Sequence, residues 1–600
     1  MIVYGDHHIR IGLHEFLAGL KLRLSSTTGE SLDETRARLI LAGQLEQAAA
    51  DADLPCAPQC RALTAVAAES FVRQALRQLA PGALPKRMEQ LLETIDRSAK
   101  STLLDIRTPE GFAWYGLYPE AYAQAADQWA QRVTAAARVL VVGVRSIGTT
   151  LAAVVSATLR ERGPQTADLT VRPHGHPFGR RTMLPPDLAP AEHAIVVDEG
   201  PGLSGSSMAS VADALVARGF SRRAITFFPG HAGGPGLHAP PAVRQWWADI
   251  PQYSVAWPEL RIGKQPSSDL LAQTAQTLLG EPLHGPLQDV GGGQWRRHVG
   301  EEGFSANAVA PPLEEQKLLA RGRSGRGILF KFAGFALAQP TAGPLLTRTE
   351  QQSQRLARLA HAGLAVAPVA SMHGWLALPW VDGRRLRASD ADRSVLELVR
   401  THIAHAAGPP LSSFEAADAC ERLRMIVICA AQELLGDRAA DSAARAADAH
   451  ARAIASLDGP AYGDGRVAPH EWIRTHCGVL KVDAGGHDDD HTAVGRQPIW
   501  WDVAGAAVEW TLNDQDADEL AHALGAQGAV LGAYYRCAYA AFRAGVAHLC
   551  ESSWADPAER ERFACAVAYY RAHLSRELRR LDRLLPEPPA IVTSVNCRSD

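Results

Sequence analysis

Two adjacent carboxylates, Asp198 and Glu199, directly follow the apolar residues 194–197, which have strand character. A loop rich in Gly and Ser comes next and leads into a helical pattern that begins at Ser206. Small residues let backbone N–H groups converge on a phosphate, and the positive end of the helix dipole adds to the attraction. The acidic pair suits ribose hydroxyls and a divalent cation. We therefore predict an anion-binding turn at this strand end.

Two further segments carry polar residues where a strand pattern ends. The β-branched run 138–144 leads into a turn with Arg145, Ser146 and Gly148. The short strand pattern at 169–172 leads into a basic loop rich in Pro and Gly. Cations in such a loop are suited to neutralising a departing anion.

The elements that must position these residues alternate between strand and helix from residue 138 to residue 228. Strand patterns at 138–144, 169–172, 194–197 and 224–228 are interspersed with helical patterns, the clearest at 147–160 and 206–218. This alternation predicts a doubly wound parallel sheet, in which ligands bind at the carboxyl ends of the strands.

The three turns together resemble the type I phosphoribosyltransferases, over about 138–230. By that resemblance the acidic pair holds ribose and Mg²⁺, the basic loop closes over pyrophosphate, and the substrate is PRPP. The Gly200-Pro201-Gly202 sequence and the longer spacing from Glu199 to Gly205 depart from the family pattern. The resemblance assigns catalytic roles to Asp198, Glu199, Arg172, His174, His176 and Arg180, and PRPP binding to Arg145, Ser146, Gly148, Gly202, Ser204, Gly205, Ser206 and Ser207.

A second resemblance covers about 310–545, where the order of motifs is similar to that of aminoglycoside-phosphotransferase-like kinases. A Gly-rich turn precedes an apolar strand with Lys331, and Glu350 opens a nearby helical pattern. The resemblance implies that Lys331 meets nucleotide phosphates with Glu350 as its partner acid, and that Asp502 binds Mg²⁺. Where the family has a His-Gly-Asp strand, this chain has His470 and Glu471 before Trp472, and we place both residues with Lys331 and Glu350 at the nucleotide site.

An acidic and His-rich run, 483–491, follows the next strand pattern. Together with Asp502, Asp483 is suited to a divalent cation through oxygen ligands. The alternative interpretation of the run is a solvated turn.

Composition limits the functional classes. The chain has 600 residues, a formal net charge of −4, 46% hydrophobic and 21% charged residues, which is typical of a folded protein of several domains. There is no overall basic charge for nucleic acid, no apolar run of membrane-spanning length, and no Cys pattern of a zinc site. We expect a cytoplasmic protein with reduced thiols.

We predict an α/β multidomain chain, with a phosphoribosyltransferase-like doubly wound domain and an α+β kinase-like domain with a helical C-lobe. The expected segments are a helical region 1–125, the phosphoribosyltransferase-like domain 126–240, a mixed linker 241–300, a kinase-like N-lobe 301–386, a helical C-lobe 387–585 and a tail 586–600. The N-terminal helices either cover the ribosyl site or form a homodimer surface.

The leading hypothesis is a Mg²⁺-dependent phosphoribosyltransferase, a pentosyl-transferring glycosyltransferase, acting between PRPP and a small-molecule acceptor, with a fused kinase-like module. One alternative is a PRPP- or nucleotide-sensing regulatory protein without catalysis. The other is an ATP-dependent small-molecule kinase that depends on Lys331 and Asp502. Neither a membrane nor a nucleic acid is expected as a partner.

Overall fold

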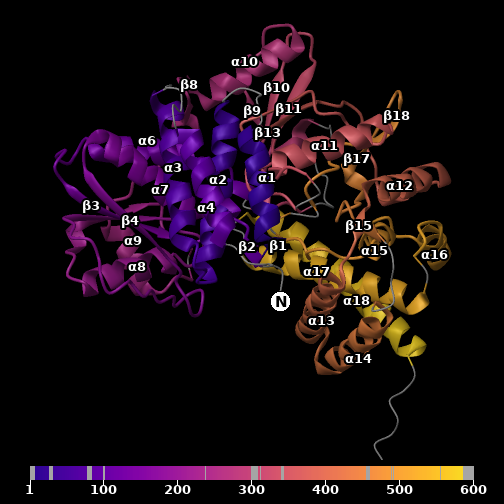
Figure 1. Ribbon diagram of the computed structural model, residues 1–600. Coiled ribbons are helices and arrows are strands. Elements are labelled where there is room, and N and C mark those ends of the chain that lie inside the picture. Colours follow the sequence, from indigo (N-terminus) through magenta and orange to yellow (C-terminus); the bar gives the residue numbers. More distant parts are fainter. Residues whose placement is uncertain are drawn as a thin grey trace, which may run out of the picture.

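A computed structural model gives the arrangement of the chain (Figure 1). It describes residues 7–25, 31–77, 84–98, 102–236, 238–298, 308–310, 313–339, 343–454, 460–487, 490, 492–526, 528–553 and 556–585. The tail predicted at 586–600 and residues 488, 489 and 491 of the acidic run lie outside this range.

The N-terminal region packs four helices beside a pair of antiparallel strands. The helices are α1 (Leu13–Ser25), α2 (Leu32–Asp51), α3 (Ala57–Arg77) and α4 (Leu84–Ser98), and the strands are β1 (His8–Gly12) and β2 (Leu103–Arg107). The side chain of Ser31 accepts a hydrogen bond from the backbone N–H of Glu34, 3.2 Å away, and so caps α2.

The alternating region forms a four-stranded parallel sheet in the order β4-β3-β5-β6. Its strands are β3 (Arg138–Val144), β4 (Gln165–Val171), β5 (His193–Val197) and β6 (Ile225–Phe228). Helix α7 (Ile147–Arg162) shares a core with one face of the sheet and α8 (Ser206–Ala217) with the other. The predicted alternation is present, but sheets of this kind serve many functions and do not establish a phosphoribosyltransferase domain.

Shorter elements precede and follow this sheet in the chain. They are α5 (Glu110–Ala113), α6 (Pro119–Ala130), α9 (Pro241–Asp249), β7 (Arg261–Ile262), β8 (Gln265–Pro266) and α10 (Ser267–Leu279).

A second, antiparallel sheet has the order β12-β13-β11-β10-β9. Its strands are β9 (Gln288–Asp289), β10 (Lys317–Arg321), β11 (Gly327–Phe332), β12 (Ala370–Met372) and β13 (Trp375–Pro379), with α11 (Arg348–His361) between β11 and β12 in the chain. Strand β9 comes from the segment predicted as a linker and pairs with β10 at the edge of the sheet.

The C-terminal region is mainly helical, with short strands at its junction with the second sheet. The helices are α12 (Arg393–Ala406), α13 (Ser413–Leu435), α14 (Asp437–Ile454), α15 (Trp500–Glu509), α16 (Asp514–Ala523), α17 (Ala529–Ser553) and α18 (Pro557–Leu584). The strands are β14 (Arg384–Arg385), β15 (Gly408–Pro410), β16 (Pro460–Ala461), β17 (Trp472–Thr475) and β18 (Gly478–Lys481).

One hydrophobic cluster crosses between the two halves of the chain. It contains Phe112 near the N-terminal helices, Val141 of the parallel sheet, and Phe332 and Trp375 of the antiparallel sheet, all of them buried. The N-terminal helices, in indigo, lie between the two sheets in Figure 1. The two sheets are therefore parts of one packed body.

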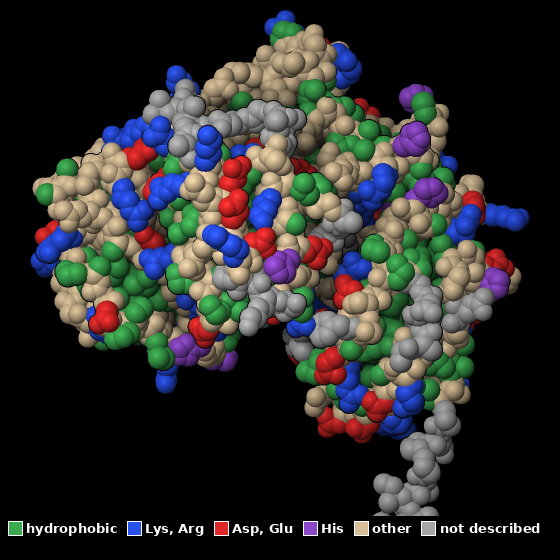
Figure 2. Space-filling model, in the orientation of Figure 1, with side chains coloured by type: hydrophobic (Ala, Val, Ile, Leu, Met, Phe, Trp, Pro, Cys, Tyr) green, Lys and Arg blue, Asp and Glu red, His purple; other side chains and the backbone are tan. Residues whose placement is uncertain are grey.

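The surface carries both signs of charge interspersed over the face drawn in Figure 2, with no field of a single sign. Among the helices that the structure describes, none combines the length and the apolar character needed to span a bilayer.

Candidate functional site

A cavity of about 280 Å³ lies between the antiparallel sheet and the C-terminal helices. One wall is apolar and is formed by Leu329, Leu378, Trp380 and Val482. Charged groups from both regions line the rest. This volume is near the lower end of the range of roughly 300–1,000 Å³ typical of small-molecule sites.

Lys331 projects from β11 to the cavity wall and is held by two carboxylates. Its Nζ lies 2.7 Å from Oδ1 of Asp483 and 3.0 Å from Oε2 of Glu315, and it donates to the carbonyl oxygen of Gly485 at 2.9 Å. Burial alone would lower the pKa of Lys331, but Asp483 and Glu315 raise it overall. The ammonium is therefore charged, and its position is fixed from three sides.

The predicted partner acid of Lys331, Glu350, is elsewhere. Its carboxylate accepts from the backbone N–H of Thr347 at 2.7 Å, completing a capping box at the start of α11. It also accepts two hydrogen bonds from the guanidinium of Arg23 on α1, at 2.8 and 2.9 Å. The prediction of a Lys331–Glu350 pair is wrong because the carboxylate of Glu350 is engaged at the N-terminus of its own helix, and Glu315 is used instead.

Asp464 is a site residue that the sequence analysis missed. Its buried carboxylate lies 2.9 Å from Nζ of Lys481 and 2.5 Å from Nε2 of His402. Burial would raise the pKa of Asp464, but Lys481 and His402 hold it well below its usual value. The signal in the sequence was Gly463-Asp464, seven positions before Glu471. The motif order instead aligned His470 and Glu471 with the family's His-Gly-Asp strand.

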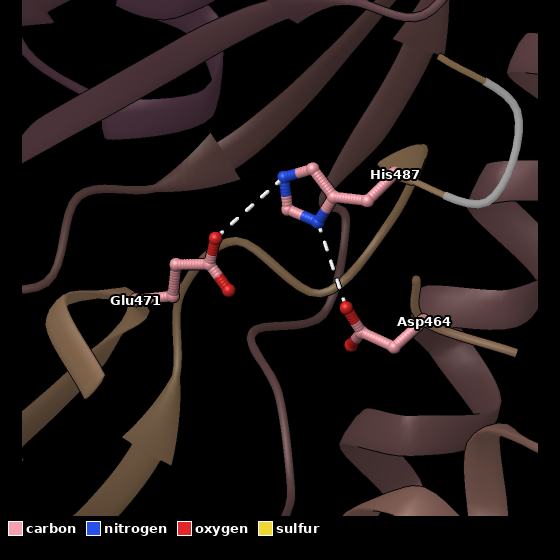
Figure 3. A group of neighbouring side chains, drawn as sticks. All are labelled: Asp464, Glu471 and His487. Atoms are coloured by element: carbon pink, nitrogen blue, oxygen red, sulfur yellow. Dashed lines mark ion pairs between the residues drawn. The ribbon is translucent and has the colours of Figure 1, made fainter. Parts of the chain in front are cut away.

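Figure 3 shows the imidazole of His487 between the carboxylates of Asp464 and Glu471. Nδ1 of His487 is 3.5 Å from Asp464, and Nε2 is 3.8 Å from Glu471 and 3.8 Å from Asp483. One ligand atom from each of Asp464, Glu471 and His487 lies within 4.8 Å of the others. This spacing is compatible with a divalent cation.

Two ammonium groups already lie on the same carboxylates. Lys481 is 3.0 Å from Glu471 and also pairs with Asp464, and Lys331 pairs with Asp483. Lys481 and Lys331 therefore neutralise part of the negative charge of Asp464, Glu471 and Asp483 that would attract a divalent cation.

Asp502 does not take the place of a metal ligand. It is buried on the first turn of α15, and its carboxylate oxygens accept from the backbone N–H groups of Gly463, Asp464 and Gly465 at 3.1, 3.1 and 2.8 Å. Burial and the charge of Asp464 raise the pKa of Asp502 to about 6. The Mg²⁺-binding role predicted for Asp502 is corrected to that of a positioning residue, because its oxygens are used to hold the segment that carries Asp464.

His470 and Glu471, predicted at the nucleotide site, both line the cavity. Nε2 of His470 lies 3.4 Å from a guanidinium nitrogen of Arg466, and burial together with the nearby guanidinium groups lowers its pKa well below the usual value. Glu471 is buried and faces Lys481 and Arg466, the latter at 3.2 Å. Direct contact of either residue with a nucleotide stays a prediction.

In the first half of the chain, Asp198 and Glu199 lie at the carboxyl end of β5, as predicted. The carboxylate of Glu199 accepts from the backbone N–H of Gly111 at 2.7 Å, and that of Asp198 accepts from the backbone N–H of Glu199 at 2.9 Å. Burial raises the pKa of Glu199 to about 7, and burial with the charge of Glu199 raises the pKa of Asp198 well above its usual value. Both carboxylates also accept backbone hydrogen bonds within the protein, and binding of ribose or Mg²⁺ by this pair stays a prediction.

The predicted cationic groups of this half are engaged with Asp51 at the end of α2. Arg145 contacts Asp51 at 3.1 Å, and Arg172 pairs with the same carboxylate while donating to the carbonyl oxygen of Arg145 at 2.9 Å. His174 and His176 are exposed, and the guanidinium of Arg180 donates to the carbonyl oxygen of Gly175 at 2.8 Å. These contacts hold Arg145 and Arg172 against α2. PRPP binding by Arg145 and closure of the loop that begins at Arg172 stay predictions.

The predicted phosphate turn leads into α8, and its serines bond within the protein. The hydroxyl of Ser206 donates to the carbonyl oxygen of Pro177 at 2.5 Å and lies 3.2 Å from that of Ser204. Gly205 has a φ of 61°, and a Cβ there would lie 2.5 Å from the indole nitrogen of Trp247. Gly148 follows the turn at Arg145 and Ser146, while Gly202 and Ser207 complete the second turn. Phosphate binding by either turn stays a prediction.

No family model and no curated protein matches the chain. Similar solved structures include the choline kinase LicA from Streptococcus pneumoniae, at 12% identity and a TM-score of 0.30, covering 51% of this chain and 98% of that chain. The macrolide 2'-phosphotransferase MphH from Brachybacterium faecium shows 15% identity and a TM-score of 0.29, covering 50% of this chain and 98% of that chain. A thermostable mutant of the aminoglycoside phosphotransferase APH(4)-Ia shows 11% identity and a TM-score of 0.30, covering 52% of this chain and 98% of that chain. Scores of this size do not establish function, so the site must be argued from its own geometry.

The predicted phosphoribosyltransferase activity is nevertheless corrected. The similar structures named above are kinases or phosphotransferases. The geometry is in keeping with the correction, because the acidic pair and the two arginines of the first half are held by intramolecular contacts. The expectation failed because strand-to-helix turns with small and acidic residues occur in many parallel α/β sheets.

Proposed function

We propose that the chain is an ATP-dependent phosphotransferase that acts on a small molecule in the cavity beside Lys331. The observation that carries the proposal is the arrangement of Lys331, Asp483 and Asp464. A buried ammonium is fixed on one carboxylate at the cavity wall, and the second carboxylate lies on a segment anchored by Asp502. Phosphoryl transfer depends mainly on such positioning and on compensation of phosphate charge.

The two sides of the cavity suit the two parts of a nucleotide. Leu329, Leu378 and Trp380 offer an apolar surface for a flat base. Lys331 offers a fixed positive charge for phosphate oxygens, which would compete with Asp483 and Glu315 for its N–H groups.

A divalent cation fits the donor set of Asp483, Glu471, Asp464 and His487, whose spacing is given above. When bound with the nucleotide, such a cation neutralises phosphate charge. Lys481 must then share Asp464 and Glu471 with the cation or leave them.

In the proposed reaction the acceptor hydroxyl oxygen forms a bond to the γ-phosphorus of ATP, while the bond from that phosphorus to the leaving ADP oxygen breaks. The hydroxyl proton passes to a carboxylate, for which we propose Asp464. Its low pKa keeps it ionised and able to accept a hydrogen bond from the hydroxyl. Asp502 fixes the backbone of residues 463–465 and so orients this carboxylate.

The second candidate is a regulatory protein that binds a nucleotide, or PRPP at the 198–207 turns, without chemistry. The observation that favours it is Lys481, whose ammonium fills the space between Asp464 and Glu471, with Asp464 buried. Formation of ADP separates the two candidates.

The test is calorimetric titration of the full chain with ATP and Mg²⁺, with ADP formation measured over a panel of hydroxyl-bearing small molecules. We expect Lys331→Met to weaken ATP binding by about tenfold or more, since a charge-assisted contact is lost. Lys331→Arg, which keeps the charge, and Lys264→Met, an exposed site, are the matched controls.

Asp464→Asn separates binding from chemistry, because it keeps the shape and removes the base. We expect it to bind ATP while losing ADP formation by about 100-fold or more. ATP binding without ADP from the wild type, over the whole panel, would favour the regulatory protein. Failure of the folded wild type to bind ATP would refute both forms of the proposal for this cavity.

A further inference from the structure

The cavity continues past the Lys331 region into a second region between α15, α17 and α18. Its walls there include the aromatic side chains of Trp501, Tyr539, Phe542 and Tyr570. Trp501 and Tyr539 have ring centroids 5.2 Å apart, and Trp501 and Phe542 5.8 Å apart. An aromatic wall of this kind binds an apolar or flat body.

Guanidinium groups converge on this region from three separate segments: Arg385 of β14, Arg466 of the loop after β16, and Arg543 of α17. A guanidinium nitrogen of Arg385 donates to the carbonyl oxygen of His470 at 2.5 Å, and one of Arg466 lies 3.4 Å from Nε2 of the same residue. Arg543 lies 3.4 Å from the hydroxyl of Tyr570. The charges of Arg466, Arg385 and Arg543 all lower the pKa of His470, in keeping with this convergence.

The carboxylates that face these guanidiniums are shared with other donors. Glu509 lies 3.6 Å from Arg543 and accepts from the hydroxyls of Tyr539 and Tyr570 at 2.8 and 2.7 Å. Glu471 lies 3.2 Å from Arg466 and also faces Lys481 at 3.0 Å. Because an arginine has five N–H donors, these contacts occupy only part of the hydrogen-bonding capacity of Arg466 and Arg543.

The Lys331 region differs, because there the carboxylates outnumber the ammonium groups with which they pair. Its acids Glu315 and Asp483 pair with Lys331, and Glu314 pairs with Lys317 at 2.8 Å. Three guanidinium groups thus line the region with the aromatic residues, where Glu471 and Glu509 face Arg466 and Arg543, and Asp490 is a further carboxylate of the cavity wall.

We propose that this second region, residues 385, 466, 470 and 543 with the aromatic wall, binds the acceptor and selects one that carries a carboxylate or phosphate on an apolar or aromatic body. The anionic group contacts Arg466 and Arg543, and the body packs on Trp501 and Phe542. This inference rests on the proposed phosphotransferase function, and it specifies the chemical class of the acceptor.

The experiment uses the full chain and three probes that share a benzene ring: 4-hydroxyphenylacetate, phenyl phosphate and tyramine. Binding is measured by calorimetry, without nucleotide, for the wild type and for Arg466→Gln. We expect at least one anionic probe to bind about tenfold or more tightly than tyramine, as charge-assisted hydrogen bonds predict. The carboxylate and phosphate arms show which anion is preferred.

Arg466→Gln should weaken the preferred anionic probe by about tenfold, and Arg223→Gln, an exposed site in the first half, should leave it unchanged. Arg385→Gln is the second variant if Arg466→Gln unfolds, with folding checked by thermal unfolding. Equal binding of tyramine, binding of neither anion, or equal effects of Arg466→Gln and Arg223→Gln would overturn the inference.

ATP binding by the same samples keeps the two proposals apart. If ATP binds but the anionic probes do not, the acceptor assignment fails and the phosphotransferase proposal stands. If the anionic probes bind as expected but ATP does not, the anion site is supported and the phosphotransferase proposal fails.

Discussion

At the scale of single residues, Lys481 is the most consequential charge in the candidate site. Its buried ammonium lies between Asp464 and Glu471, and burial, which alone would lower its pKa, is outweighed by these two acids. Removing one partner of a buried ion pair leaves an uncompensated charge, at a cost of about 3 kcal/mol or more. The charge state of the whole site therefore depends on this one side chain.

Lys481→Met should lower the free energy of unfolding by about 3 kcal/mol or more, measured by urea denaturation. A divalent cation should then raise the melting temperature of Lys481→Met more than that of the wild type, because the cation replaces the missing positive charge. The exposed Lys264→Met is the control. Equal shifts in Lys481→Met and wild type would argue against a metal site at Asp464 and Glu471.

A second residue-scale prediction concerns His450 of α14. Its ring is buried and stacks on that of Tyr534 with centroids 4.2 Å apart, and burial lowers its pKa to about 4 from 6.5. Between pH 6.5 and pH 4, His450 is therefore protonated in the unfolded chain but mostly neutral in the folded chain. Stability is therefore lost as the pH falls from 6.5 to 4, by up to about 3 kcal/mol for this group.

His450→Phe removes that titration, so its free energy of unfolding should fall less steeply than that of the wild type between pH 6.5 and pH 4. Urea denaturation at several pH values measures the difference. Parallel curves for the two proteins would show that His450 is not a source of acid sensitivity.

At the scale of elements, α11 is fastened to the N-terminal helices. Arg23 of α1 pairs with Glu34 of α2 at 2.7 Å and with Glu350 of α11 at 2.8 Å, and also donates to the carbonyl oxygen of Leu345 at 2.7 Å. The start of α11 is thus held by the side chain of Arg23, which lies 327 positions before Glu350 in the sequence. This contact ties the second sheet to the first helices.

Arg23→Ala should lower the free energy of unfolding by about 2–4 kcal/mol and increase amide hydrogen exchange in α11, because Glu350 and the carbonyl of Leu345 lose their Arg23 donor, while Glu34 keeps Arg38. Glu350→Gln keeps an oxygen acceptor for the cap and removes the ion pair, so its effect should be smaller. Unchanged exchange in α11 of Arg23→Ala would contradict this role.

At the scale of the whole molecule, the two sheets share one buried cluster. Phe335 donates its backbone N–H to the carbonyl oxygen of Phe112 at 2.8 Å, and Phe112 and Phe332 lie in the same cluster as Val141. Elements joined through a common core lose their protection against exchange together. We therefore expect the two sheets to unfold in one transition.

Phe332→Ala should cost about 3–5 kcal/mol and lower hydrogen-exchange protection in both β11 and β3. Ile426→Ala, a buried site in the separate helical cluster of α13, is the comparison and should act first on the C-terminal helices. Protection of β3 that is unchanged in Phe332→Ala would show that the sheets unfold independently.

Local structure was predictable from the sequence where neighbouring residues carry the information. The strands at 138–144 and 194–197 and the helix that begins at Ser206 followed from apolar patterning and from the Gly- and Ser-rich turn before the helix. The candidate site was predictable only in part: Lys331, Glu471 and Asp483 were named, but Asp464 and Glu315 were missed. Asp464 is followed by a segment unlike the expected motif, so its position beside Glu471 and His487 could not be predicted from the motif order.

Patterning in the sequence is sufficient to predict the alternating strands and helices of the first half and the position of Lys331 on an apolar strand, and the sequence also gives a formal net charge of −4. The packed fold settles which acid meets Lys331, that Asp502 holds backbone N–H groups, and that Arg145 and Arg172 contact Asp51. Patterning acts between neighbours in the chain, whereas a charge pairs with whichever partner the packed core brings within reach. Lys331 and Asp483 are 152 positions apart in the sequence and 2.7 Å apart in space.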